Sequence, residues 1–587
     1  MKKISKRPSL NNKSAQAAAP AAHKSTQIWR WQGGILLAIL LVAAILRFVQ
    51  LDQVPPGLHV DEAANAWNAY TLLKTGKDQH GVSWPILYTR AFGENRSTIY
   101  IYALLPFQAI GGLNIWTTRL PAALGGVLTI LLVFVIGARQ FNLETGLLAA
   151  GLLALNPWHL QVSRYALEAS LVPFCLMASI AAMYWANLPL GEHDSTQPRP
   201  VIAALAGAII GISCYGYWSI RMFLPLFIAA IILLNWPAWR SCLEKRKRFL
   251  AIFIFATTAV LIIAPLFWSH LYDPSIAARG RNVGWVWEES DWLGWKAGKI
   301  FLRYLQHFSP DFLFVTGDLN PALAPPAGVG LFHWHELPLM AIGMWVTIKR
   351  ASSSVAARVL LAWILLYPVG DLLFGYIGMH SLRSLPGLGA FILLEAIGTL
   401  WFGSWIWSNR YHRLQITCAA TLIVAVVYFN LNALQSFFGA KFDLQKRSES
   451  IYPSDILDAA RWLRPRLKTL DAVFITGQAI HPYIMTLVGL EYDPQQWFRD
   501  TKEIMPGPLP DGRHKFEDIY LRFGKIYFIY NESSLALLKE LSQNGRPDHV
   551  ILILRPGELG LDQYARPVYE VRGPDGRPAL WIFDLIL

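Results

Sequence analysis

The chain has 587 residues, of which 54% are hydrophobic and only 16% are charged, a composition that excludes an ordinary soluble protein and indicates a membrane protein. The net charge of +13 could suggest nucleic acid, but the basic residues fall in short clusters between apolar runs, as in the cytoplasmic loops of multi-pass membrane proteins. We therefore expect the lipid bilayer as a partner and no nucleic acid.

The N-terminal segment, residues 1–32, is expected to form a disordered cytoplasmic tail, because most of it is rich in Lys, Ser, Ala and Asn. An apolar run at residues 33–51 follows, and its length of about 20 residues is enough to cross a bilayer. This run lacks a small-residue cleavage site. We therefore expect it to remain in the protein as the first membrane helix.

Ten further apolar stretches are predicted to be spans, so the expected fold class is a polytopic α-helical membrane protein of about 11 to 13 transmembrane helices. With the tail in the cytoplasm, the short basic loops also fall there, which satisfies the positive-inside rule. The eleven spans are residues 33–51, 119–138, 144–160, 171–187, 200–218, 222–239, 249–269, 336–348, 358–377, 385–407 and 414–434.

One apolar stretch, residues 97–112, is left out of that set. If it crossed the membrane, the later loops would change sides and the basic run at residues 245–248 would face outward, against the positive-inside rule. Tyr100, Tyr102 and Pro106 suit the headgroup boundary. We therefore expect an interfacial or re-entrant helix.

An odd number of spans places residues 437–587 outside the cytoplasm. This region is not membrane-like, and we expect an extracytoplasmic α/β domain large enough to bury its own core. The membrane domain then covers residues 33–436, with extracytoplasmic loops at 52–118 and 270–335. The C-terminal domain is predicted to contain helices at 454–467 and 533–541 and strands at 473–476, 526–530, 549–554 and 580–585.

The leading candidate site is the acidic pair Asp61 and Glu62, directly after the first span. Carboxylates at a membrane boundary are costly unless they have a function, so both are candidate catalytic residues. The alternative is that they only cap a helix at residues 62–73, where acidic side chains are favoured.

Other polar residues are predicted to lie on the same side of the membrane. Three arginines are candidates for binding a phosphate, because a guanidinium can engage two phosphate oxygens. The candidate phosphate ligands are Arg96, Arg164 and Arg383, and the further candidate substrate ligands are Glu94, Glu168 and His380. As alternatives, Arg96 and Arg383 could extend to the lipid headgroups, and Arg164 could pair with Glu168 at helical spacing.

No metal site is predicted. The cysteines, Cys175, Cys214, Cys242 and Cys418, lie in or beside apolar stretches without paired spacing. His333 and His335 are two residues apart, whereas the helical zinc pattern requires two histidines four apart.

The order of these motifs resembles the C-type integral-membrane glycosyltransferases, most closely the protein O-mannosyltransferase and aminoarabinose transferase branch. The resemblance covers roughly residues 33–400. The residues that carry it are Asp61-Glu62, Gly76, Glu94, Arg96, Arg119-Leu120-Pro121, Asn156-Pro157, Ser163-Arg164-Tyr165 and the run from His380 to Pro386.

The resemblance implies an enzyme that passes a sugar from a polyprenyl-phosphate carrier to an extracytoplasmic acceptor. It implies that Asp61 is the catalytic base, that Glu94 and Arg96 lie near the donor phosphate, and that Glu168 replaces an aspartate of the second loop. A divalent cation is possible as a cofactor, and the need for one stays open. The sugar and the acceptor, whether lipid A, protein, polysaccharide or another glycolipid, stay open.

A second function class also places charges in a membrane cavity: a transporter or flippase of a lipid-linked or anionic solute. Such a protein should have two related halves with broken helices at matching positions, and the sequence contains no such repeat. We therefore favour the glycosyltransferase. We expect a multi-pass protein of the bacterial inner membrane with its active site on the extracytoplasmic face.

Overall fold

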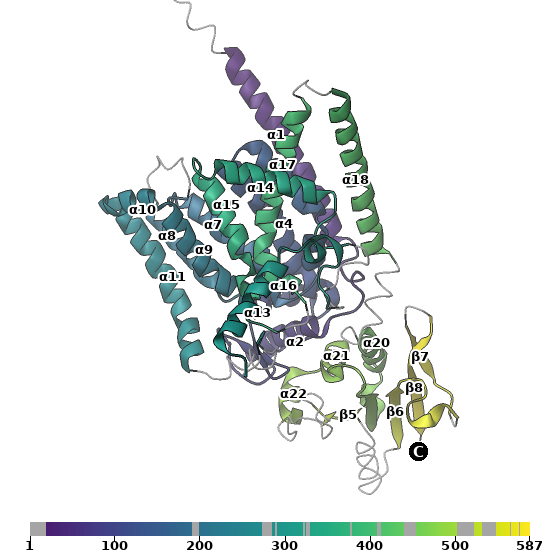
Figure 1. The fold of residues 1–587 in the computed structure, drawn as a ribbon. Coiled ribbons are helices and arrows are strands. Elements are labelled where there is room, and N and C mark those ends of the chain that lie inside the picture. The colour runs from purple at the N-terminus through teal and green to yellow at the C-terminus, as the bar shows by residue number, and fades with distance from the viewer. Residues whose placement is uncertain are drawn as a thin grey trace, which may run out of the picture.

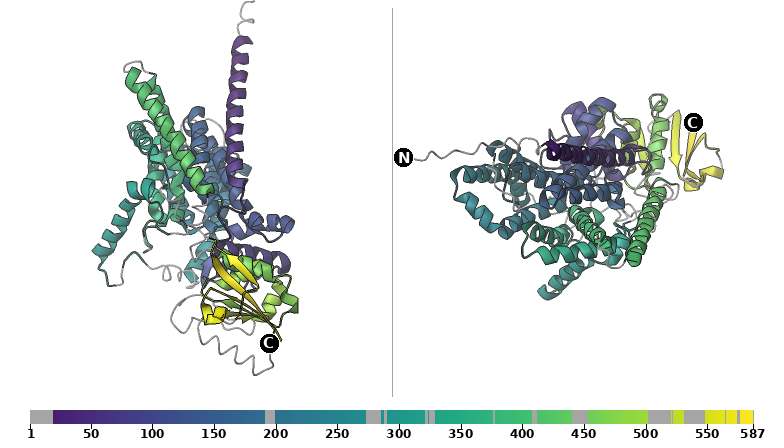
Figure 2. Two further views of the ribbon diagram at one scale, coloured as in Figure 1. Left: turned by 90° about the vertical axis from the view of Figure 1, so that its right-hand side faces the viewer. Right: turned by 90° about the horizontal axis from the view of Figure 1, so that it is seen from above.

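A helical bundle and a C-terminal α/β domain make up the molecule (Figure 1). The α/β domain lies at one end of the bundle, opposite the end from which α1 projects (Figure 2). The computed structural model describes residues 19–190, 199–272, 285–287, 290–320, 323, 329–375, 378–407, 412–439, 453–501, 520, 522–530, 548–563, 565–573 and 576–586.

The bundle is built from helices of very different lengths. Its long and medium helices are α1 (Ala19–Phe48), α2 (Val60–Thr75), α3 (Ile99–Gly111), α4 (Ile115–Gln140), α5 (Leu143–Leu155), α7 (Val172–Trp185), α8 (Pro200–Ser213), α9 (Trp218–Leu234), α11 (Arg246–Tyr272), α13 (Leu293–Gln306), α14 (Glu336–Arg350), α15 (Val355–Leu366), α17 (Leu388–Ile406) and α18 (His412–Phe438). The short ones are α6 (Pro157–Val162), η1 (Glu168–Leu171), α10 (Trp236–Leu243), η2 (Asp311–Val315), η3 (Tyr367–Gly370), α16 (Ser381–Ser384) and η4 (Leu385–Gly387).

A helix occurs at each of the eleven expected spans. Within the described residues, six segments are long and apolar enough to cross a bilayer unaided, and α9 with α10 is a seventh if that bent pair is one span. The six are Trp31–Phe48, Ile115–Gln140, Glu168–Trp185, Arg246–Tyr272, Ser381–Ile406 and Arg413–Phe438. The protein is therefore a multi-pass membrane protein, while the count of eleven crossings stays a prediction.

Several spans differ from the expected boundaries for local reasons. Helix α1 begins at Ala19, so residues 19–32 belong to a helix and only residues 1–18 of the expected tail lie outside the described part of the chain. Helix α5 ends at Leu155 because Pro157 has no N–H to continue it, and Asn156 instead caps the short α6. At Asn235 the chain bends by 84° between α9 and α10.

The C-terminal domain contains a six-stranded mixed sheet in the order β4-β5-β3-β6-β8-β7. Strand β3 pairs in parallel with β5 and β6, and the remaining pairs are antiparallel. The elements are α20 (Ser454–Leu463), β3 (Ala472–Thr476), α21 (Pro482–Leu490), α22 (Pro494–Asp500), β4 (Arg522–Phe523), β5 (Ile526–Ile529), β6 (His549–Leu554), β7 (Tyr569–Arg572) and β8 (Pro578–Ile586). The four predicted strands and the helix at 454–467 are present, whereas the predicted helix at 533–541 lies outside the described residues.

The first loop of the bundle and the C-terminal domain share one hydrophobic core. Helix α2 packs against α21 and α22 (Figure 1). Trp67 of α2 makes an edge contact with Trp497 of α22, with ring centroids 6.3 Å apart. The indole Nε1 of Trp497 also donates a 2.9 Å hydrogen bond to the carbonyl of Gln79. The C-terminal domain is therefore anchored on the loop that carries the acidic pair.

Candidate functional site

Helix α2 begins with a capping box that uses Glu62, not Asp61. His59 is the N-cap, and its Nδ1 accepts a 3.0 Å hydrogen bond from the backbone N–H of Asp61. The Glu62 carboxylate accepts one of 2.8 Å from the His59 N–H. Capping, the alternative function of the acidic pair, thus belongs to Glu62.

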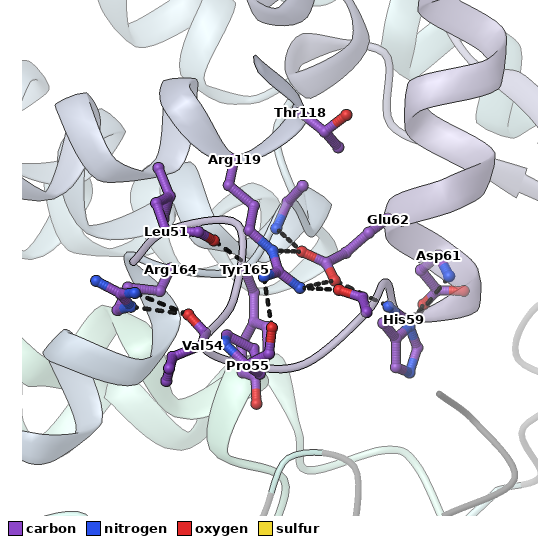
Figure 3. A network of polar contacts seen from close by, with 12 residues as sticks. Leu51, Val54, Pro55, His59, Asp61, Glu62, Thr118, Arg119, Arg164 and Tyr165 are labelled. Atoms are coloured by element: carbon purple, nitrogen blue, oxygen red, sulfur yellow. Dashed lines mark hydrogen bonds and ion pairs between the residues drawn. The ribbon is translucent and has the colours of Figure 1, made fainter. Parts of the chain in front are cut away.

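The Glu62 carboxylate is also fully buried in an ion pair with Arg119 of α4. Nε and Nη2 of Arg119 donate to its two oxygens, each at 2.9 Å, and the Ala166 N–H donates at 2.7 Å. Arg119 donates further to the carbonyls of Leu51, Pro55 and Gly57 at 3.1, 2.7 and 2.6 Å. Figure 3 shows Glu62 facing Arg119, with Asp61 turned away beside His59.

Arg164 contacts neither Glu168 nor the cavity in which the other candidate arginines lie. Its guanidinium is buried and donates to backbone carbonyls just after and within the end of α1, at Leu46, Val49, Gln50 and Val54, over 2.8 to 3.0 Å. All three guanidinium nitrogens donate in this way, and the Leu46 carbonyl lies in the last turn of α1, where carbonyls lack partners within the helix. These bonds give Arg164 a structural role at the end of α1, while its expected role as a phosphate ligand stays an untested prediction.

A cavity of about 130 Å³ brings together the remaining candidates except Glu94. Asp61 from α2, Arg96 from β2 and Glu168 from η1 meet there with His380 and Arg383 from the segment before α17. Among the described residues, the lining is formed by His59, Asp61, Arg96, Leu167, Glu168, Ala169, Tyr217, Asn320, Leu323, His380, Leu382 and Arg383.

Arg96 lies between the two carboxylates of this cavity. It ends a hairpin formed by β1 (Thr89–Ala91) and β2 (Glu94–Arg96). Its Nη1 is 2.9 Å from Oδ1 of Asp61 and 3.7 Å from Oε1 of Glu168. Burial by itself would lower the pKa of the Arg96 guanidinium, but nearby carboxylates, Asp61 first among them, raise it above its ordinary value. Arg96 is therefore a firmly charged cation at the cavity wall.

Glu168 and Glu94 contribute to the site in different ways. The Glu168 carboxylate is 6% exposed and accepts a 3.1 Å hydrogen bond from the Ser97 N–H, which ties η1 to the end of β2. Glu94 is half-buried on β2 and adds to the negative field around Arg96. Glu94 is not part of the cavity lining, so its expected contact with substrate stays a prediction.

Asp371, which the sequence analysis did not single out, holds Arg383 of the cavity lining. Its buried carboxylate is 2.8 Å from Nη2 of Arg303, 3.1 Å from Nη1 of Arg383 and 3.3 Å from Nε2 of His307. The Arg383 guanidinium also lies over the ring of Phe374, 4.3 Å from its centroid. An ionisable residue inside an expected span, 358–377, was the available signal for this role.

Asp318 holds the segment that carries His380. Its Oδ2 accepts 2.7 Å hydrogen bonds from both the N–H and the hydroxyl of Ser381, and its Oδ1 accepts one of 2.9 Å from the Asn320 N–H. The Nδ1 of His380 is 3.6 Å from Oδ2. Asp318 thus fixes two residues of the cavity lining, Asn320 and His380.

Within the described residues, no group of three or more His, Cys, Asp or Glu side chains is placed to hold a metal ion. His333 and His335 stack on each other, with ring centroids 5.4 Å apart, and both lie near Phe429 of α18.

Comparison with known proteins finds a family match over part of this chain and a similar fold over most of it. Residues 37–272 match the model of the dolichyl-phosphate-mannose-protein mannosyltransferase family. A curated relative from Pseudomonas fluorescens (strain Pf0-1), undecaprenyl phosphate-alpha-4-amino-4-deoxy-L-arabinose arabinosyl transferase 2, is 28% identical over 246 residues, which are 41% of this chain and 40% of that protein. The match thus spans well under half of the relative.

Two solved structures of ArnT from Cupriavidus metallidurans have a similar fold over nearly the whole chain. The apo structure aligns with a TM-score of 0.54, and the structure bound to undecaprenyl phosphate aligns with one of 0.55. Each alignment has 13% sequence identity and covers 94% of this chain and 98% of ArnT. The prediction of a polytopic helical membrane protein with a C-terminal α/β domain is therefore confirmed.

Proposed function

We propose that this chain, whose residues 37–272 match the model of the dolichyl-phosphate-mannose-protein mannosyltransferase family, transfers a sugar from a polyprenyl-phosphate carrier to an extracytoplasmic acceptor. The observation that carries the proposal is the convergence of two carboxylates, Asp61 and Glu168, and two guanidinium groups, Arg96 and Arg383, on one cavity. The ArnT structure with undecaprenyl phosphate supports the class of donor, since it shares this fold.

Arg96 and Arg383 are the proposed ligands of the donor phosphate. A planar guanidinium donates to two phosphate oxygens at once and stays charged near the bilayer, where a buried anion needs a cation. The two side chains come from different elements, β2 and α16, and are held by Asp61 and Asp371 respectively. Such preorganised cations stabilise the charge that develops on the leaving phosphate.

Asp61 is the proposed general base. The oxygen of the acceptor hydroxyl forms a bond to the anomeric carbon while the bond from that carbon to the phosphate oxygen breaks. The hydroxyl proton passes to the Asp61 carboxylate, and polyprenyl phosphate leaves with the electron pair. Attack from the face opposite the phosphate inverts the anomeric configuration. A phosphate at Arg96 would compete with Asp61 for that guanidinium and release the carboxylate to accept the proton.

Glu62 and Arg164 are left out of this reaction. The contacts of the Glu62 carboxylate with Arg119, Ala166 and His59 occupy it inside the protein. The Arg164 nitrogens are occupied by the carbonyls at the end of α1.

Removal of the Arg96 guanidinium should weaken donor binding. We expect Arg96→Ala to lower the affinity for a polyprenyl phosphate by about 1.5 to 3 kcal/mol, the range for a hydrogen bond to a charged group. The measurement is equilibrium binding of undecaprenyl phosphate to the detergent-purified protein. Arg90→Ala is a matched control, because Arg90 is exposed on the same hairpin and outside the cavity lining. Equal affinities of Arg96→Ala and the parent would remove Arg96 from the phosphate site.

The proposed extracytoplasmic location can be tested by labelling. Val568, which is 54% exposed beside β7, should as Val568→Cys react with a membrane-impermeant maleimide in intact cells, once the native cysteines are replaced. Ser353→Cys, in the exposed turn between α14 and α15, should react only after lysis. The opposite pattern would invert the topology.

The sugar and acceptor can be identified by mass spectrometry. Glycolipids and glycoproteins of cells that contain the parent protein should carry a sugar that is missing in cells with Asp61→Asn. Identical profiles would argue against glycosyl transfer.

A further inference from the structure

The hairpin that carries Arg96 has an unusual turn. Phe92 and Gly93 form its two-residue loop, with φ of 55° and 73°. A turn with positive φ at both positions is typical of tight hairpins, but Asn-Gly is the preferred pair, and a bulky aromatic residue in the left-handed region is a conformational outlier. Something outside the hairpin must therefore favour Phe92 at this position.

His481 of the C-terminal domain makes that contact. Its imidazole stacks on the Phe92 ring with centroids 3.9 Å apart and an interplanar angle of 23°. His481 itself has φ of 48°, in the left-handed region. It immediately precedes Pro482, and a residue before proline favours extended backbone. Two residues in costly conformations thus face each other, and both are buried, at 6% and 9% exposure.

The Phe92 ring is also a support for the proposed phosphate ligand. The Arg96 guanidinium carbon lies 5.1 Å from the Phe92 ring centroid, within the range of a cation–π interaction. The same guanidinium is 2.9 Å from Asp61. A continuous chain of side-chain contacts therefore runs from His481 of the C-terminal domain through Phe92 and Arg96 to Asp61 at the cavity.

We infer that His481 is a positioning residue, which acts through Phe92 to hold Arg96 in the orientation that binds the donor phosphate. The C-terminal domain would then be part of the donor site and not only an appended module. This inference rests on the proposed function, because it takes Arg96 as a phosphate ligand. Residues with strained backbone often cluster at functional sites. Here the two strained residues, Phe92 and His481, lie next to Arg96, which lines the cavity.

The test removes the rings without removing the turns. Asn tolerates the left-handed region, so Phe92→Asn should keep the hairpin and His481→Asn should keep the start of α21. We expect both variants to bind undecaprenyl phosphate about 5 to 20 times more weakly than the parent, a part of the loss for a charged hydrogen bond. His481→Phe, which restores a ring, should recover most of the affinity.

A merely structural role would not give this pattern. Phe92→Asn relieves an outlier, so a residue that served only the turn would leave affinity unchanged and raise the melting temperature. Trp497→Phe is the matched control: it removes the hydrogen bond to Gln79 in the same domain interface and should leave donor affinity near that of the parent.

The outcomes separate this inference from the proposed function. If Arg96→Ala weakens binding but His481→Asn does not, the inference is wrong and the phosphate site stands. If the parent binds no undecaprenyl phosphate, the proposed function fails. A cryo-EM structure of His481→Asn then decides the positioning role alone: Arg96 displaced from Asp61 supports it, and Arg96 unmoved overturns it.

Discussion

Asp61→Asn should reduce turnover by about 100-fold or more, the lower end of what a positioned general base contributes. Asn keeps the size of the side chain and can still accept a hydrogen bond from Arg96 through its amide oxygen, but it cannot take the acceptor proton. The N-terminus of α2 should remain intact, because its cap is made by His59 and Glu62. The measurement is the initial rate of sugar transfer by a purified variant with the melting temperature of the parent.

The control for Asp61→Asn is Asp61→Glu, which keeps a carboxylate but moves it by one methylene. It should retain more turnover than the Asn variant and bind the donor as well as the parent. If Asp61→Asn keeps most of its turnover, Asp61 is not the base, and Glu168 is the next residue to test, because it is the other carboxylate of the cavity lining.

The membrane architecture was predictable because bilayer solvation acts on long stretches of sequence. An apolar run identifies a helix at each expected span, but it does not locate breaks. The end of α5 depends on Asn156 and Pro157, and the 84° bend after α9 depends on a short turn at Asn235, both within apolar surroundings. Hydrophobicity alone contains no signal for these features.

In the C-terminal domain the buried strands were the predictable part. Strands β3, β5 and β6 form an apolar centre of the sheet, and their bounds agree with the expected ones within a residue. Strand β7 has a single buried residue, Val571, so its pattern is weak. Helix α21 is buried throughout and has no polar face to give it a helical period.

Which arginine meets a ligand could not be read from the sequence. Arg96, Arg119 and Arg164 all border apolar segments, and the sequence predicts the same side of the membrane for all three. Of these three, only Arg96 lines the cavity. The Arg164 guanidinium donates its hydrogen bonds to carbonyls at the end of α1, and the Arg119 guanidinium donates to Glu62 and three carbonyls. The difference is a matter of which backbone oxygens lie within reach, and that depends on tertiary packing.

The Glu62–Arg119 pair should be essential for stability. Both side chains are fully buried, and removal of one partner leaves the other charge without compensation, which typically costs about 3 to 5 kcal/mol. We therefore expect Glu62→Gln and Arg119→Met each to lower the melting temperature of the detergent-purified protein markedly. Surviving folded Glu62→Gln protein should still turn over substrate at low temperature, since Glu62 is outside the proposed reaction.

A double-mutant cycle tests whether the two side chains act as a pair. Glu62→Gln/Arg119→Met removes both charges, so its loss of stability should be smaller than the sum of the two single losses. Additive losses would contradict a direct pair. Removal of one charge from a buried ion pair should lower stability. A Glu62→Gln variant with the melting temperature of the parent would therefore contradict the pair. If that variant also had no turnover, Glu62 would be assigned the catalytic role that its position beside Asp61 first indicated.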